Sequence, residues 1–211
     1  MGYETVKEKS KEFIITAHGP FYINLNSKEQ EKVDASILRI IDTAKMTSDV
    51  GGYSITYHAA FYLDEDKDVV FKKVVERTSE IISVLERENI NIWIRPETTG
   101  KATQWGDIDE IINLSKEFKQ VLPCVDFSHI HARNIGTYNT YDEFCEILEK
   151  IEKGLGRTAL DNFHGHLAGI EYGAKGEKNH LNLDESDMNY KDLLKALKSF
   201  DVCRWYLLAI A

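Results

Sequence analysis

The feature that most constrains the fold is a repeated alternation between short apolar runs and longer segments of helical periodicity. The apolar runs predict strands at residues 13–17, 53–57, 90–95, 121–126, 158–164 and 202–210. The helical spacings predict helices that follow these runs, with apolar faces in residues 33–44, 66–89, 108–119, 141–153 and 188–199. Alternation of this kind predicts an α/β fold with parallel strands joined by right-handed crossovers.

Three polar signals mark where predicted helices begin. Ser27–Gln30 and Thr140–Glu143 have the form of capping boxes, and Asp107 precedes the helix at 108–119. The stretch from about 165 to 186 carries no clear periodicity, and we predict a long loop there.

Histidines and acids recur at the ends of the apolar runs. His18, His58, His129, His164, His166 and His180 stand at or just past such runs or in the following loop, and Glu97 and Asp126 end two others. Because the carboxyl ends of barrel strands gather the active site, we expect a cluster of imidazoles and carboxylates suited to zinc, manganese or iron. Of His164 and His166, we expect only one to face the barrel mouth, and we expect His131 to be a surface loop residue.

Two architectures compete for this pattern, an open doubly wound sheet and a barrel. Neither GxGxxG nor GxxxxGK[ST] occurs, and the candidate ligands follow nearly every strand, which favours the barrel. The sequence offers only about six of the eight strands that a closed barrel requires. We therefore predict an incomplete TIM-barrel-like fold, either open and C-shaped or covered at its edge by a second copy of the chain.

Composition narrows the classes of function. The length of 211 residues fits one domain over residues 1–211, and a formal charge of −9 disfavours nucleic-acid binding through a broad basic surface. The three cysteines are far apart and form no CxxC pair, which disfavours a disulfide framework and fits a cytoplasmic protein. No cysteine belongs to the expected cluster of ligands, which disfavours a structural zinc site. No apolar stretch reaches the roughly 20 residues that cross a membrane, so we expect no membrane partner.

Five segments in order carry a family resemblance: AHGPFYINL, ITYHAAFY, IRPETTGKATQWG, CVDFSHIHAR and HGHLAGIEYGAKGEKNH. Over residues 5–200 the chain resembles the endonuclease IV family of apurinic/apyrimidinic endonucleases, within the xylose-isomerase-like TIM barrels. The resemblance implies a trinuclear zinc site, with Mn²⁺ as an alternative metal. It also implies hydroxide attack on the phosphate 5′ to an abasic sugar in DNA.

The family's site carries over residue by residue. His18, His58 and Glu97 match the ligands of the first metal, while Glu97, Asp126 and His166 match those of the second. His129 and His180 match ligands of the third metal, and Glu97 is the residue expected to be catalytic. The residues expected to contact substrate are aromatic or cationic: Phe21, Tyr22, Lys101, Trp105, Arg133, Tyr172, Lys175 and Lys178.

The chain departs from the family pattern at three places. Lys178 stands where an Asp is expected, and strand alternation is expected to point the adjacent Glu177 elsewhere. No acid follows Asp201, where the family has a ligand glutamate, and about two strands that would precede the one ending at His18 are missing. Two alternatives therefore stay open: a metal-dependent isomerase or epimerase acting on a small sugar, and a metal-binding or partner-binding remnant of the fold.

Overall fold

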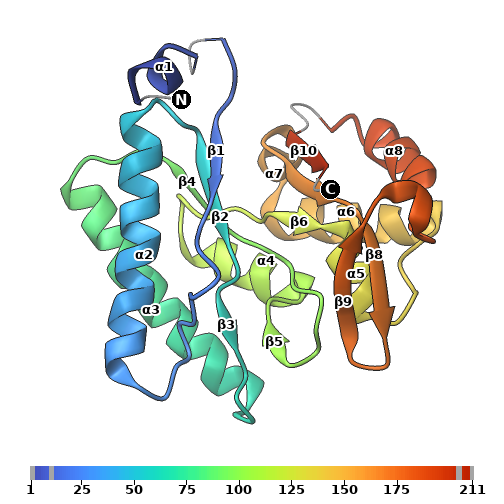
Figure 1. Ribbon diagram of the computed structural model, residues 1–211, viewed down its shortest axis with the longest axis horizontal. Coiled ribbons are helices and arrows are strands. Elements are labelled where there is room, and N and C mark those ends of the chain that lie inside the picture. The colour runs from blue at the N-terminus through green and yellow to red at the C-terminus, as the bar shows by residue number, and fades with distance from the viewer. Residues whose placement is uncertain (1–2, 10–11, 203–205, 210–211) are drawn as a thin grey trace. The chain divides into compact units, whose positions relative to one another are not determined.

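The computed structural model describes residues 3–9, 12–202 and 206–209 (Figure 1). The chain divides into two compact units. The first comprises Met1–Pro96 with Glu117–Leu122, and the second comprises Glu97–Lys116 with Pro123–Ala211. Strands and helices alternate through both, as the sequence predicts.

The first unit is built on a parallel sheet in the order β1-β2-β4. β1 (Thr16–His18) pairs with β2 (Ser54–Tyr57), which pairs in turn with β4 (Trp93–Pro96). A parallel bridge between Ile94 and Val121 adds the segment at 117–122 beside β4. The remaining elements of this unit are α1 (Tyr3–Lys9), α2 (Gln30–Asp49), β3 (Ala60–Phe61) and α3 (Lys67–Arg87).

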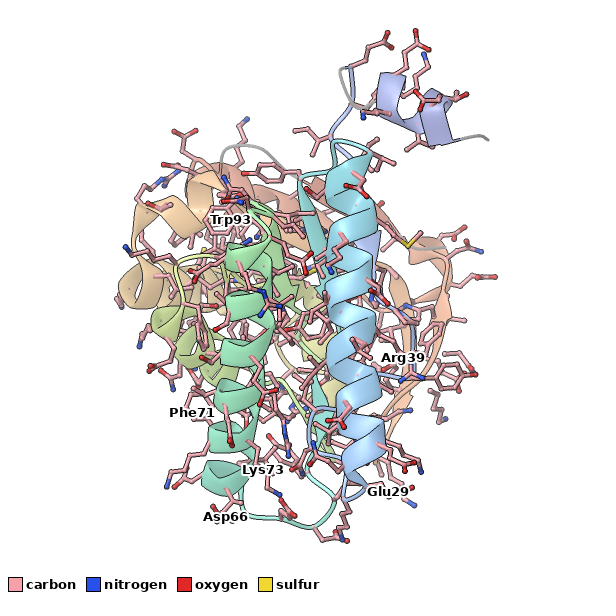
Figure 2. All side chains as sticks on the ribbon, turned by 90° about the vertical axis from the view of Figure 1, so that its left-hand side faces the viewer. Glu29, Arg39, Asp66, Phe71, Lys73 and Trp93 are labelled. Carbon is pink, nitrogen blue, oxygen red and sulfur yellow. The ribbon has the colours of Figure 1, made fainter. Side chains whose placement is uncertain are left out.

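Helices α2 and α3 lie side by side in the first unit (Figures 1 and 2). The face of α3 that carries Val70, Val74 and Leu85 is fully buried. Its first turn is capped by Asp66, whose carboxylate accepts hydrogen bonds from the backbone N–H groups of residues 68 and 69, at 2.9 and 3.4 Å. A cap of this kind stabilises a helix by about 1 kcal/mol.

The three predicted helix starts have different outcomes. The Thr140–Glu143 capping box is confirmed, since Thr140 Oγ1 accepts from the Glu143 amide and the Glu143 carboxylate accepts from the Thr140 amide. Asp107 is confirmed as a cap, because its carboxylate accepts from the amide of Glu110 at 2.9 Å. The box predicted at Ser27 is wrong: α2 begins at Gln30 itself, too late for that side chain to reach its third helical position.

The second unit contains a parallel sheet in the order β10-β7-β6. Its strands are β6 (Val125–Asp126), β7 (His164–Leu167) and β10 (Tyr206–Ala209). Its other elements are β5 (Gln104–Trp105), α4 (Ile108–Glu117), α5 (Phe127–Arg133), α6 (Tyr141–Leu155), α7 (Arg157–Asp161), β8 (Gly169–Gly173), β9 (Gly176–Leu181), the 3-10 turn η1 (Leu183–Glu185) and α8 (Tyr190–Ser199).

Two predictions for this unit are wrong. Residues 157–161 form α7 instead of a strand, because Gly156 ends α6 at a φ of 75° and the ion pair from Arg157 to Asp161, 2.8 Å, joins positions one helical turn apart. The strand starts later, at His164. The predicted loop to 186 is instead an antiparallel hairpin of β8 and β9, which turns near Gly176 at a φ of 89°.

The α/β fold predicted from the sequence is confirmed. Across the described ranges the two parallel sheets hold three strands each, fewer in total than the eight of a complete barrel. The apolar run near the C-terminus contributes β10, and its residues 203–205 and 210 lie outside the described ones. None of the helices described is long and apolar enough to cross a membrane.

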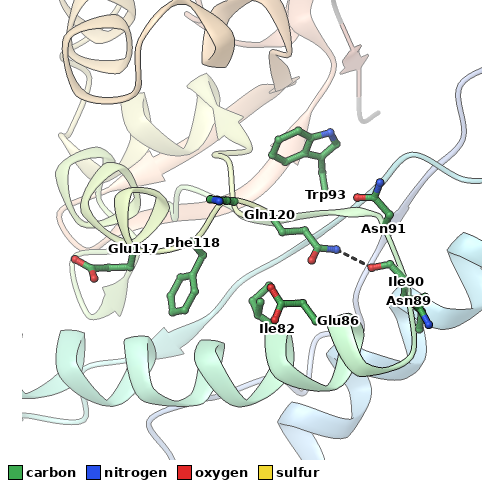
Figure 3. A pocket seen from close by; sticks show the side chains of 10 residues that line it. Ile82, Glu86, Asn89, Ile90, Asn91, Trp93, Glu117, Phe118 and Gln120 are labelled. Carbon is green, nitrogen blue, oxygen red and sulfur yellow. Dashed lines mark hydrogen bonds between the residues drawn. The ribbon is translucent and has the colours of Figure 1, made fainter.

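A hollow of about 600 Å³ opens in the first unit at the amino end of β4 (Figure 3). Trp93 and Phe118 line it, and Gln120 crosses it to donate hydrogen bonds to the carbonyls of Ile90 and Ile92, at 2.9 and 2.6 Å. The candidate ligand Glu97 follows the other end of that strand. This hollow is therefore not where the predicted chemistry lies.

Candidate metal centre

Glu97, Asp126 and His166 meet in the second unit, and we call them the inner cluster. A parallel bridge pairs Glu97 with Cys124, and the β6–β7 register pairs Asp126 with His166, so the three residues lie on neighbouring segments. His166 Nδ1 lies 2.7 Å from Glu97 Oε1 and 4.0 Å from Asp126 Oδ2. Each residue is at most 1% exposed. One potential ligand atom from each lies within 4.8 Å of the others, which suits one cation.

The two oxygens of Asp126 have different surroundings. Oδ1 accepts from the backbone N–H of His129 at 2.8 Å and so caps α5. Oδ2 is buried without a hydrogen-bond partner in the described part of the chain. A buried carboxylate oxygen is costly unless it is bonded or neutralised, which is the environment that a cation would satisfy. The donor set therefore fits a divalent metal. Oδ1 of Asp126 caps α5, so Oδ2 is the atom that could bind the metal.

The electrostatics of the inner cluster also favour an added positive charge. Burial lowers the pKa of His166, but the neighbouring Cys124 and Glu97 outweigh burial and raise that pKa to about 12. Two opposing effects also act on His129. Burial lowers its pKa, but the carboxylates of Asp126, Glu97 and Glu177 have the larger combined effect, so the pKa is raised. A metal ion would supply the charge that a proton supplies here, and binding it would release that proton.

His129, Glu177 and His180 form an outer cluster in the same unit. The carbonyl of Thr98 lies 2.9 Å from His129 Nδ1, so in the neutral ring a proton on Nδ1 leaves the lone pair on Nε2. That Nε2 lies 3.7 Å from Glu177, and His180 Nε2 lies 3.6 Å from the other oxygen of the same carboxylate. The potential ligand atoms lie within 4.8 Å of one another, which suits a second cation.

Glu177 points into this cluster, contrary to the expectation from strand alternation. The β8–β9 register pairs Glu171 with Asn179 but Tyr172 with Glu177, so Lys178 is an extra, bulged residue. One inserted residue reverses the alternation and puts Glu177 on the same face as His180. The amide of Glu177 also donates to the Gly100 carbonyl at 2.9 Å, and a Cβ at Gly100 would lie 2.5 Å from the Glu177 carboxylate. The glycine leaves the space that this carboxylate occupies.

His18 and His58 approach each other in the first unit. His18 ends β1 and His58 directly follows β2, the strand paired with β1, and their ring centroids lie 5.5 Å apart. The carbonyl of Gly19 lies 2.7 Å from His18 Nδ1, which leaves His18 Nε2 as the candidate ligand atom. The trio predicted for the first metal is divided between the units, because Glu97 belongs to the second.

His164 and His166 lie on the same face of β7, with His164 at the start of the strand and His166 nearer its carboxyl end. Residues two apart in a strand share a face, and the two ring centroids lie 5.2 Å apart. Cys124, which the pattern of strand-end ligands does not include, belongs to this face as well, since its sulfur lies within 4.8 Å of a nitrogen of each ring. Its position two residues before Asp126, on the same face of the predicted strand, is the sequence feature that could have indicated it.

His131 is fully buried in α5, so its assignment as a surface loop residue is wrong. Its Nδ1 lies 2.9 Å from the Thr137 carbonyl and its Nε2 lies 3.1 Å from Asp187. Asp187 also accepts a 2.7 Å hydrogen bond from the hydroxyl of Tyr172, a predicted substrate contact on the hairpin. This chain of contacts fixes the hairpin, which carries Glu177, to α5, which carries His129.

The other predicted substrate residues of the second unit differ in exposure. Trp105 is fully buried, whereas Lys175 is exposed and Lys101 is half-buried. One guanidinium nitrogen of Arg133 donates to Thr99 Oγ1 and to the carbonyls of residues 101 and 104, and so holds that loop. Lys178 is exposed and pairs with Glu171 at 3.0 Å. Their substrate contacts stay predictions.

In the first unit, Phe21 and Tyr22 are 90% and 80% exposed. They line a hollow of about 400 Å³ together with Lys32, Arg39 and Phe61. Arg39, which projects from α2 (Figure 2), donates a hydrogen bond to the backbone carbonyl of Tyr22 at 3.1 Å and so holds that loop against the helix. Exposed aromatic rings beside cations are suited to stacking on bases and contacting phosphates.

Comparison with known proteins identifies the family. The profile of the xylose isomerase-like TIM barrels matches residues 3–210. The chain belongs to this family. An uncharacterized protein of Methanocaldococcus jannaschii is 50% identical to the present chain over 196 residues, which are 93% of this chain and 71% of that relative. A probable endonuclease 4 of Methanosphaera stadtmanae is 23% identical over 182 residues, 84% of the chain and 63% of that relative.

Among solved structures, a D-tagatose 3-epimerase-like protein matches this TIM-barrel chain with a TM-score of 0.74 at 18% identity, over 98% of the chain and 75% of that protein. At that identity the likeness shows the fold alone. The family match and the endonuclease 4 relatives confirm the resemblance predicted from the sequence. They do not identify the substrate, which has to be argued from the site.

Proposed function

We propose that the chain binds divalent cations, zinc or manganese, and hydrolyses the phosphodiester 5′ to an abasic sugar in DNA. The observation that carries the proposal is the buried Oδ2 of Asp126, which accepts no hydrogen bond from the described residues and lies 3.5 Å from His129 Nδ1 and 4.0 Å from His166 Nδ1. Endonuclease 4 relatives at the level of sequence support the choice of an abasic-site substrate.

The chain's own residues would act mainly by positioning and by charge. Bound divalent cations supply an activated water and offset the charge of the reacting phosphate. Glu97 and Asp126 supply the negative charge that holds such cations, and Thr98 fixes the ring of His129 through its carbonyl. Burial of the inner cluster excludes water that would weaken these interactions.

Recognition of DNA would be local, because a net charge of −9 gives no broad attraction to a duplex. The exposed rings of Phe21 and Tyr22, with Lys32 and Arg39 in the same hollow, are the proposed stacking and phosphate contacts. An aromatic contact of this type contributes about 1–3 kcal/mol per stacked base.

Epimerisation of a small sugar is the second candidate. The acidic net charge and the fold of the D-tagatose 3-epimerase-like protein favour it, since that chemistry needs a metal and carboxylates but no polyanion. The outer cluster favours the phosphodiesterase, because a second group of donors around Glu177 exceeds what one metal needs.

The deciding experiment incubates the full chain, freed of metal and reloaded with Zn²⁺ or Mn²⁺, with a duplex that carries one abasic site. We expect one cut 5′ to the abasic sugar, leaving a 3′-hydroxyl, and no cut in the intact duplex. Metal analysis of the same sample is expected to give more than one ion per chain. Epimerisation of a ketose with an uncut duplex would replace this proposal by the second candidate.

Replacing Glu177 with glutamine should weaken metal binding at the outer cluster by at least about tenfold. The amide keeps the shape of the side chain but removes the charge that faces His129 and His180. Competition with a chromophoric chelator measures the change. The control Glu171→Gln alters an exposed carboxylate on β8 that faces Lys178, and it should leave metal affinity unchanged. Equal affinities of the two variants would exclude Glu177 as a ligand.

A further inference from the structure

Cys124 and His164 form a cross-strand pair one step below the inner cluster. The β6–β7 register pairs Val125 with Gly165 and Asp126 with His166, so the preceding pair is Cys124 with His164. Because side chains two residues apart share a face, the four side chains of these two pairs form a ladder on one face. The lower pair places a thiol and a second imidazole directly beside His166.

The lower pair and His166 have the spacing of a metal site. The Cys124 sulfur and one nitrogen from each imidazole lie within 4.8 Å of one another. Tetrahedral zinc, with bonds of about 2.0–2.3 Å, separates its ligand atoms by about 3.3–3.8 Å, so small side-chain rotations would close the site. All three side chains are at most 1% exposed, so bulk water would not compete with them for a bound ion.

The ligand chemistry of this group differs from that of the inner cluster. The inner cluster offers two carboxylates and one imidazole, which suit manganese as well as zinc. Cys124, His164 and His166 offer one thiolate and two imidazoles, which favour zinc and softer ions and disfavour manganese. No carboxylate is needed to complete this set.

We propose that Cys124, His164 and His166 bind a zinc-class divalent cation in a buried, thiolate-containing site. The bound ion ties β6 to β7, and its binding displaces the thiol proton of Cys124. The site does not depend on the proposed phosphodiesterase activity. It shares only His166 with the inner cluster, so filling one set is expected to weaken the other.

Cobalt titration of the metal-free full chain tests the proposal, since thiolate-bound Co²⁺ absorbs in the near ultraviolet by charge transfer. We expect a band that saturates at about one equivalent, disappears in Cys124→Ser and requires at least about tenfold more cobalt in His164→Asn. Cys145→Ser, a half-buried cysteine of α6, is the matched control and should keep the band. A folded Cys124→Ser protein that retains the band would overturn the proposal.

Two further measurements separate this site from the inner cluster. X-ray absorption of the zinc-loaded wild-type chain should show one sulfur at about 2.3 Å, and a shell of nitrogen and oxygen alone would overturn the proposal without any variant. Glu97→Gln should keep the cobalt band although it removes one of the two carboxylates of the inner cluster. A wild-type chain that shows the cobalt band but does not cut the abasic duplex would reject the proposed function and leave the thiolate site standing.

Discussion

Replacing Glu97 with glutamine is expected to lower metal-dependent cleavage at an abasic site by about 10²–10⁴-fold, the range for removing a group that acts in the transition state. Glu97 is 1% exposed, and its carboxylate lies 2.7 Å from His166 and 3.6 Å from His129. One carboxylate thus serves the histidines of both clusters. Single-turnover cleavage of a labelled abasic duplex at saturating metal measures the loss.

The same variant should lose its stabilisation by metal while the metal-free protein stays folded. An ion present at 100 times its dissociation constant stabilises the native state by about 2.7 kcal/mol, which thermal unfolding detects. We expect this shift in the wild type and little of it in Glu97→Gln. Glu149→Gln, an exposed carboxylate of α6 paired with Lys153, should behave as wild type in both assays. Undiminished cleavage by Glu97→Gln would remove Glu97 from the proposed mechanism.

The inner cluster could be predicted because its chemistry is local to the sequence. An acid that ends an apolar run, as Asp126 does, is costly to bury without a partner, and the sequence alone therefore marks it as a candidate ligand. The strand ends that carry Glu97 and His166 follow from the alternation of elements. The family resemblance assigned these residues to one metal, which stays a prediction, and the structure brings their side chains together.

The partnership of Cys124 with His164 and the direction of Glu177 could not be predicted, because both depend on pairing between strands. The place of Cys124 two residues before Asp126 indicates only the face on which its side chain lies. The place of Glu177 follows from a bulge at Lys178, which exists only in the register of β8 with β9. Cysteine spacing along the chain gives Cys124 no partner, because its neighbour His164 lies on another strand. His131 was misplaced because α5 begins directly after β6, where a loop was expected.

Helix α5 links the fold to the site through side chains on successive residues. Ser128 Oγ donates to the Ala168 carbonyl and accepts from the Ala168 amide, both at 2.8 Å, which attaches α5 to the end of β7. His129 faces the outer cluster, and His131 contacts Asp187. The packing that holds this short helix therefore controls the position of several candidate ligands.

Phe127, the first residue of α5, packs that helix against other aromatic rings of the second unit. It is fully buried, with its ring 5.8 Å from Phe144 in an edge-on arrangement and 6.2 Å from Phe163. Phe127→Ala should lower the free energy of unfolding by about 3–5 kcal/mol, because the lost burial and the cavity add together. Urea unfolding followed by circular dichroism measures this change.

Phe127→Leu separates stability from function, since it keeps most of the buried volume and should cost less than the alanine variant. If α5 positions His129, the leucine variant should bind metal at the outer cluster more weakly while remaining folded. Phe13, 62% exposed, provides the matched control, and Phe13→Ala should change unfolding by no more than about 0.5 kcal/mol. Wild-type metal affinity in a destabilised Phe127→Leu protein would mean that the clusters are held by the strands and the hairpin alone.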